Sequence, residues 1–135
     1  MATGYVYDPL YLEHDAEYHP ENKERLLAIM QALEAGGILA GLRAIPAVDV
    51  PMPALLAVHE AVYVQRVRAR AEGGGGWLDP DTYVARGSYA AALRAAGGVR
   101  EATWAVMKGQ VQNAFALVRP PGHHALPGQD RKSVV

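Results

Sequence analysis

The sequence contains no cysteine, which excludes disulfides, thiolate metal sites and cysteine nucleophiles together. It also lacks a charge imbalance, because 13 Lys and Arg residues stand against 14 Asp and Glu residues, for a formal net charge of -1. A chain with this balance has no overall attraction for nucleic acid or for an anionic membrane surface. We therefore expect neither as a partner, and any ligand must be recognised locally.

Long apolar runs are missing as well. No segment approaches the roughly 18 consecutive apolar residues that a transmembrane helix requires. The first twenty residues carry Asp8, Glu13, Asp15 and Glu17 and have no basic start followed by an apolar run, which excludes a secretory signal peptide. The sequence therefore predicts a cytoplasmic protein.

What is present is enough apolar material for a core, since 50% of the 135 residues are hydrophobic. Strand patterns cover residues 4–7, 42–50 and 114–118, the last being a continuous apolar run typical of a buried strand. Helical spacing is expected from Pro20 to the Gly36-Gly37 pair and over residues 54–71 and 88–108. We interpret residues 8–19 and 73–76 as loops and residues 77–86 as irregular.

These patterns alternate along the chain, which is the mark of an α/β fold with a mainly parallel sheet flanked by helices. Within the helices, apolar stripes are expected to face the core. They comprise Leu26, Ile29, Met30 and Leu33 in the first helix, and Leu55, Val58 and Val62 in the second. The glycines Gly97 and Gly98 inside the long alanine-rich helix favour close packing or a break rather than chemistry.

The segment after the last strand holds the strongest candidate for chemistry, the histidine pair His123-His124. In open α/β sheets, sites gather in the loops at the carboxyl ends of strands, and imidazole is suited to proton transfer near neutral pH. From spacing alone, a surface loop or partners of a buried carboxylate explains the pair equally well. A metal-ligand role is disfavoured, because adjacent residues in extended chain point to opposite faces.

The same segment, Arg119-Pro120-Pro121-Gly122-His123-His124-Ala125, resembles the signature of the histone deacetylase superfamily. Its form is that of the class II enzymes and of bacterial relatives of the acetylpolyamine amidohydrolase type. Further segments resemble the family in the same order along the chain: His19-Pro20-Glu21 with Arg25-Leu26, Val58-His59 with Tyr63-Val64, Asp79-Pro80-Asp81-Thr82, Ser88-Tyr89, and Ala95-Ala96-Gly97-Gly98. The resemblance runs from about Tyr5 to His124.

This resemblance implies the N-terminal part of an arginase/deacetylase-type domain, in which a metal-bound water attacks the carbonyl of an acetylated amine. It implies that His124 is the general base and acid, that His123 stabilises charge, and that a buried carboxylate lies behind each. Asp79 resembles the rim aspartate that holds the substrate backbone, although the neighbouring Asp81 competes for this assignment. Gly122 is similar to a residue of the acyl channel, and Arg25 to the arginine at the inner end of the acetate pocket. Acetylated lysine or polyamine is the implied substrate, and His14, His19 and His59 are assigned no catalysis.

The family's Zn²⁺ ligands are expected on an Asp-x-Asp-x-His strand and a later loop, which do not occur in the residues after His124. We therefore expect Zn²⁺ in a full-length parent, no metal bound by this chain, and no catalysis by the chain alone. Residues 1–129 are interpreted as the N-terminal portion of a deacetylase domain, and residues 130–135 as a non-native tail, either adapter-like or frameshifted. The alternatives are a ureohydrolase of the same fold, which the Pro-Pro-Gly-His-His segment disfavours, and a non-catalytic module that binds an acetylated ligand or a protein. Nothing in the sequence predicts an oligomeric state.

Overall fold

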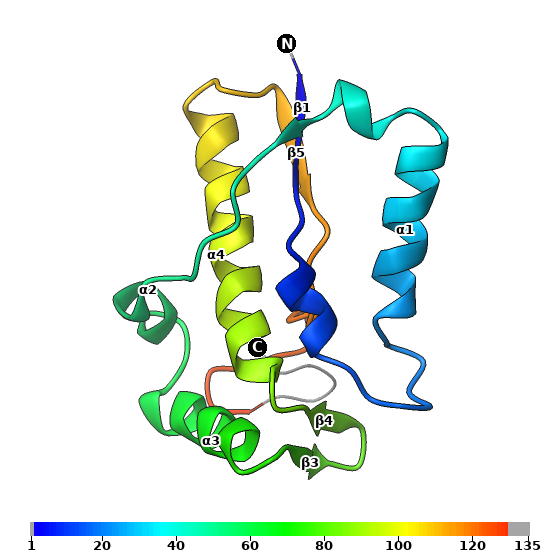
Figure 1. The fold of residues 1–135 in the computed structure, drawn as a ribbon. Coiled ribbons are helices and arrows are strands. Elements are labelled where there is room, and N and C mark those ends of the chain that lie inside the picture. Colours follow the sequence, from blue (N-terminus) through cyan, green and yellow to red (C-terminus); the bar gives the residue numbers. More distant parts are fainter. Residues whose placement is uncertain (1, 130–135) are drawn as a thin grey trace.

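The computed structural model describes residues 2–129, so the interpretation of residues 130–135 as a tail lies outside the described residues. Its centre is a three-stranded parallel sheet in the order β2-β1-β5, formed by β1 (Thr3–Val6), β2 (Arg43–Ala44) and β5 (Asn113–Ala116). Helix α4 (Ser88–Met107) lies on one side of the sheet and α1 (Glu24–Ala35) on the other (Figure 1). The predicted α/β class with a parallel sheet flanked by helices is confirmed.

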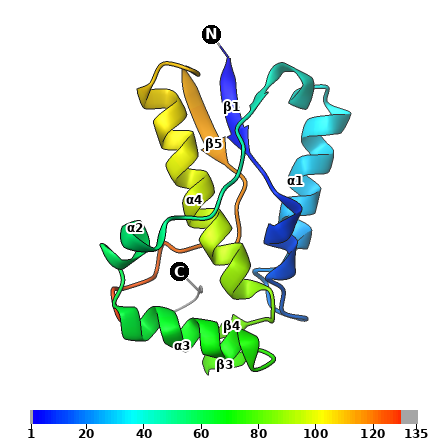
Figure 2. The same ribbon diagram turned by 60° about the vertical axis from the view of Figure 1, so that its left-hand side comes forward.

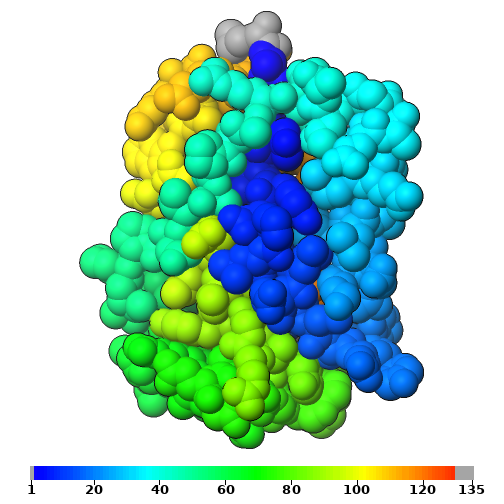
Figure 3. All heavy atoms as spheres, viewed as in Figure 1, coloured from blue at the N-terminus to red at the C-terminus, as the bar shows by residue number. Residues whose placement is uncertain are grey.

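Four shorter elements lie below the sheet. Helices α2 (Met52–Leu56) and α3 (Ala61–Glu72) lead into an antiparallel hairpin of β3 (Gly76–Asp79) and β4 (Thr82–Val84). Figure 2 shows α3 and the hairpin beneath the N-terminal end of α4. Two 3-10 helices, η1 (Pro9–Glu13) and η2 (Leu39–Gly41), complete the fold. In Figure 3, β1 and η1 run down the middle of the face between α1 and α4.

The core consists of three small groups of buried side chains rather than one large one. Val6 and Val111 pack with Ala102 and Ala105 of α4, and Tyr11 packs with Leu26, Ala95 and Leu117. Below them, Tyr63, Val67 and Ala71 of α3 pack on Val84 and Ala92. Because the alanines of α4 contribute to all three groups, α4 is the element against which the rest of the chain packs.

The predicted apolar stripes are partly wrong. Leu26 is buried, but Ile29 is 42% exposed, so α1 buries a narrower face than its spacing suggests. On the second helical segment, Val58 and Val62 are 66% and 73% exposed, and the buried face of α3 is formed by Tyr63, Val64, Val67 and Ala71. The buried positions differ from the predicted stripe because residues 54–71 form parts of two helices, α2 and α3, instead of one.

That helix break has a tertiary cause. Glu60 is extended, with φ -66° and ψ 137°, and its N–H donates to the carbonyl of Pro127 at 2.8 Å. The segment that follows the histidine pair therefore takes the hydrogen bond that a continuous helix would have used. The interruption sets the direction of α3 and places its N-terminus beside residues 125–129.

Two other segments differ from the sequence prediction. Residues 42–50 form only the two-residue strand β2, after which the chain leaves the sheet to cross α4, where the Val50 N–H donates to the Leu93 carbonyl at 2.9 Å. Residues 77–86, expected to be irregular, contain most of the β3-β4 hairpin. Within residues 2–129, every helix is too short or too polar to span a bilayer.

Candidate active site

The carboxyl end of β5 leads into an open pocket that holds the histidine pair. Its lining comes from three parts of the chain: the turn before α1 together with the start of that helix, the tip of the hairpin, and the segment after β5. The lining residues are His19, Pro20, Glu21, Arg25, Asp81, Pro121, His123 and His124. Of the five predicted site residues, the structure therefore brings together His123, His124 and Arg25, and it leaves Asp79 and Gly122 outside this lining.

The two imidazoles contact each other and are exposed to solvent. Their ring centroids are 4.1 Å apart with an angle of 49° between the planes. No hydrogen bond joins either ring to a carboxylate among residues 2–129, so the carboxylates implied by the resemblance are not supplied by the described residues. The two rings thus lie against each other in the lining of the pocket, where both are exposed to solvent.

The two aspartates of the hairpin tip have different surroundings. Both oxygens of Asp79 are used inside the hairpin: Oδ1 accepts the Asp81 N–H and Oδ2 accepts the Thr82 hydroxyl, each at 2.8 Å. Asp81 instead lines the pocket, and its Oδ1 lies 3.1 Å from Nε2 of His19. The geometry therefore favours Asp81 over Asp79 as the carboxylate that faces a ligand.

Replacing Asp79 with alanine is expected to lower the free energy of unfolding by about 1–2 kcal/mol, because two hydrogen bonds to a half-buried carboxylate are lost. Replacing Asp81 with alanine, the matched control, should change it by less than about 0.5 kcal/mol, because that side chain is half exposed. Urea denaturation of the two variants measures the difference. Equal effects would contradict the division of roles between the aspartates.

Arg25 and Gly122 line different pockets. The Arg25 side chain is 65% exposed and its Nη1 is 3.8 Å from Oε1 of Glu21. Gly122 borders a second, apolar hollow together with Val58, Ala96 and Val118. Only Arg25 therefore shares the pocket of the histidine pair.

A buried arginine anchors the histidine segment. Arg119 is 3% exposed, and its Nε and Nη2 donate to Oε1 and Oε2 of Glu21 at 2.8 and 2.7 Å. Its Nη1 also donates to the carbonyl of His14 and, at 3.4 Å, to that of Tyr11. Sequence reasoning missed this pair, although both members stand inside the two motifs that the resemblance rests on.

His14 is buried next to this pair and is held neutral. Ser88 Oγ accepts the Ala85 N–H at 2.7 Å and is also hydrogen-bonded to Nδ1 of His14 at 2.7 Å. Burial, assisted by the positive charge of Arg119, lowers the pKa of His14 from 6.5 to about 4. His14 is therefore a buried histidine that links the loop after η1 to Ser88 at the start of α4.

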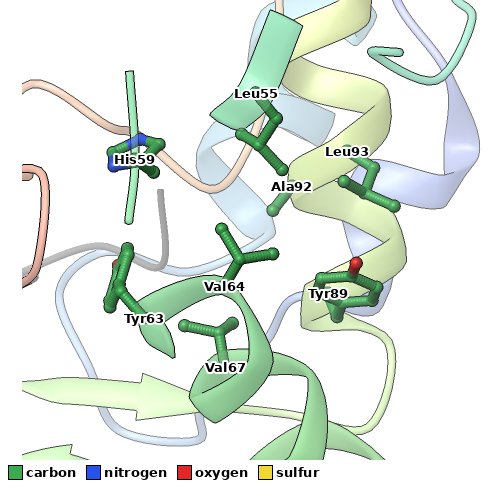
Figure 4. A pocket seen from close by; sticks show the side chains of 8 residues that line it. All are labelled: Leu55, His59, Tyr63, Val64, Val67, Tyr89, Ala92 and Leu93. Carbon is green, nitrogen blue, oxygen red and sulfur yellow. The ribbon is translucent and has the colours of Figure 1, made fainter. Parts of the chain in front are cut away.

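His19 and His59 have structural surroundings of different kinds. The Glu21 N–H donates to Nδ1 of His19 at 3.1 Å, which leaves a proton on Nε2 to donate to Asp81. His59 borders an apolar pocket between α2, α3 and α4 (Figure 4), where its ring lies 5.5 Å from that of Tyr63 and its buried Nδ1 has no partner among the described residues. Neither ring contacts the histidine pair.

The described residues do not form a metal site. Among residues 2–129, no three His, Asp or Glu side chains are grouped closely enough to hold a metal ion. The pocket does contain imidazoles and carboxylates, but they are engaged in the contacts described above or are not close enough to share an ion. This donor set therefore does not fit the Zn²⁺ that the resemblance implies.

Comparison with known proteins finds relatives that match most of the chain. The family model described as "Histone deacetylase domain" matches residues 19–132. The chain is 38% identical to a probable deacetylase of Archaeoglobus fulgidus over 130 residues, covering 94% of this chain and 36% of that protein. It is 39% identical to a histone deacetylase-like amidohydrolase of Pseudomonas aeruginosa over 126 residues, covering 93% of this chain and 32% of that protein.

A solved structure shows the same arrangement of elements. The HD domain of HDA15 superposes with a TM-score of 0.87 at 35% identity, covering 92% of this chain and 36% of that chain. The chain thus spans about a third of the length of each of these relatives.

Proposed function

Because this chain belongs to the histone deacetylase family, we propose that it forms the part of a zinc-dependent deacetylase domain that carries the histidine pair and one wall of the substrate pocket. The observation that supports this most directly is the convergence of His123, His124, Asp81 and Arg25 on one open pocket at the carboxyl end of β5. The substrate we propose is an acetylated lysine or an acetylated polyamine. Its amide would be hydrolysed to acetate and a free amine.

In this proposal, each pocket residue acts on the acetylated amine through its own chemistry. His124 takes a proton from the attacking water and returns it to the departing amine, and His123 stabilises the charge that develops beside it. Asp81 accepts a hydrogen bond from a substrate N–H at the rim, and Arg25 holds the carbonyl or acetate end. The Zn²⁺ ligands of the whole domain would come from outside residues 2–129, because these residues contain no group that fits the ion.

The chain by itself is therefore expected to hydrolyse neither an acetyl-lysine peptide nor an N-acetylpolyamine, with or without added Zn²⁺. Release of the free amine and calorimetric titration with Zn²⁺ measure hydrolysis and metal binding separately. A catalytic rate above that of buffer, or Zn²⁺ bound at micromolar affinity, would contradict the proposal. Binding of an acetylated ligand without turnover would instead support the alternative, a non-catalytic acetyl-ligand module.

A chimera tests whether this chain can form part of an active deacetylase domain. Residues 1–129 of this chain would be fused to the remaining part of the Pseudomonas aeruginosa amidohydrolase and assayed with an acetyl-lysine peptide and Zn²⁺. We expect hydrolysis that falls by about 100-fold or more in His124→Ala, the range lost with a general base, and that survives Arg43→Ala on the far edge of the sheet. A folded, metal-loaded chimera with equal activity in His124→Ala would overturn the assignment.

A further inference from the structure

Two motifs far apart in the sequence are joined by one ion pair at the base of the histidine segment. Glu21 belongs to the His-Pro-Glu turn and Arg119 begins the Arg-Pro-Pro-Gly-His-His segment, 98 residues later. Both Glu21 oxygens are used, at 2.8 and 2.7 Å. A bidentate contact of this kind fixes the orientation of the guanidinium plane as well as its position.

The rest of the guanidinium is also held. Its Nη1 donates to the backbone carbonyls of His14 and Tyr11, so Arg119 is fixed to η1 and the loop after it as well as to the turn before α1. The Arg119 side chain is only 4% exposed and that of Glu21 is 18% exposed. Because little water reaches this ion pair, the solvent weakens the attraction between its two charges only slightly.

The segment between Arg119 and the histidines is short and stiff. Pro120 and Pro121 each have a fixed φ and no N–H group, and the Ala125 N–H closes a turn on the Gly122 carbonyl at 3.0 Å. Fixing the position of Arg119 therefore also restricts the positions that His123 and His124 can take. Glu21 also lines the pocket of the pair, so the anchor and the imidazoles border the same space.

We propose that Glu21 is a positioning residue for the histidine pair: through Arg119 it fixes the Pro120-Pro121 segment and thereby the place of both imidazoles in the pocket. This inference rests on the proposed function, because the placement matters only if the pair reacts. It assigns a role to the His-Pro-Glu turn, to which the sequence analysis assigned no chemistry. Glu21 itself does not contact the reacting atoms in this scheme.

The test is a comparison of two glutamine variants of the chain by NMR. Glu21→Gln keeps the size of the side chain but removes its charge, whereas Arg94→Gln breaks another ion pair, that of Arg94 with Asp8 and Asp49 at 2.9 and 2.7 Å. The readouts are the exchange rate of the Ala125 amide and the ring-to-ring contacts between His123 and His124. The exchange rate of the Leu117 amide, bonded to the Val6 carbonyl at 2.8 Å, reports opening of the core.

In Glu21→Gln we expect the Ala125 amide to exchange at least tenfold faster relative to the Leu117 amide, and the contacts between the two imidazoles to weaken. In Arg94→Gln both should keep their wild-type values. Equal acceleration of both amides in Glu21→Gln would mean that the ion pair only stabilises the fold, and unchanged imidazole contacts would also overturn the proposal. If Glu21→Gln does not fold, Glu21→Asp, which keeps the charge on a shorter side chain, is compared in the same way.

These readouts report geometry and do not require turnover. Failure of the positioning proposal would therefore leave the chimera result untouched. Conversely, an inactive chimera would leave the measured effect of Glu21 on the pair in place. The two hypotheses can thus fail separately.

Discussion

Gly97→Ala is expected to lower the free energy of unfolding by about 3 kcal/mol, the upper part of the range for overpacking a core. A Cβ atom at position 97 would lie 1.8 Å from the Val48 carbonyl oxygen and 2.6 Å from the Val50 nitrogen. Both are backbone atoms, so relief requires the whole segment to move away from α4. That movement would break the hydrogen bond from the Val50 N–H to the Leu93 carbonyl. The gain of about 1 kcal/mol from placing alanine in a helix does not offset these losses.

Two neighbouring substitutions serve as controls for Gly97→Ala. At Gly98, a Cβ would meet the Tyr11 hydroxyl at 2.7 Å and Val6 Cγ1 at 2.8 Å, which are side-chain atoms that can shift. At Gly41, nothing lies within 4 Å. Urea denaturation should therefore rank the variants with Gly97→Ala the least stable, Gly98→Ala in between and Gly41→Ala near wild type. If Gly97→Ala were as stable as Gly98→Ala, the close crossing at Val48 would be wrong.

Acidification is expected to remove about 3 kcal/mol of stability through His14 alone, the equivalent of lowering its pKa from 6.5 to about 4. Between these values the unfolded chain binds a proton on this imidazole and the folded chain does not. The contribution of His14 is therefore fully present above about pH 6.5 and is lost as the pH falls toward 4. Its cause is the burial of the ring, with Arg119 opposing a second positive charge.

His14→Asn isolates this contribution. The asparagine oxygen can accept the Ser88 hydroxyl in place of Nδ1, but it cannot take up a proton in this range. Denaturation curves at pH 7, 5.5 and 4 should show a smaller loss of stability on acidification in the variant than in wild type. Parallel curves for the two proteins would show that His14 does not titrate in this way. Burial raises the pKa of Asp15, but the Lys23 N–H and ammonium together lower it by more, so that its pKa is below the usual 3.8. Asp15 therefore adds to the loss of stability only at pH values near or below 3.8, and does so in both proteins.

The features of the fold that the sequence predicts correctly are formed by local interactions. The extent of α4 was predicted within one residue of its end, because alanine-rich sequence forms helix on its own propensity. A strand near residue 114 and the position of His123-His124 beyond its carboxyl end were also predicted, but the strand is not buried as expected, because β5 lies at an edge of the sheet with Asn113 and Phe115 exposed and Ala114 and Ala116 half-buried. Each of these features depends on residues that are neighbours in the chain.

Two of the incorrect predictions lie where a distant residue intervenes. Helical spacing continues through Glu60, but the Pro127 carbonyl takes its N–H and divides the helix. Apolar alternation continues to residue 50, but the chain leaves the sheet at Ala44 to cross α4 at Gly97. In both cases a tertiary contact outweighs a local preference worth well under 1 kcal/mol per residue.

The sequence by itself determined the α/β class, the family motifs and the histidine pair, because local periodicity and short motifs record them. Only the tertiary structure decided that Asp81 rather than Asp79 faces the pocket, since His19, which Asp81 contacts there, lies 62 positions away in the sequence. It alone also joined Glu21 to Arg119. Two residues 98 positions apart cannot be paired from the periodicity of one sequence. Their contact forms because a buried guanidinium is stable only with a carboxylate beside it.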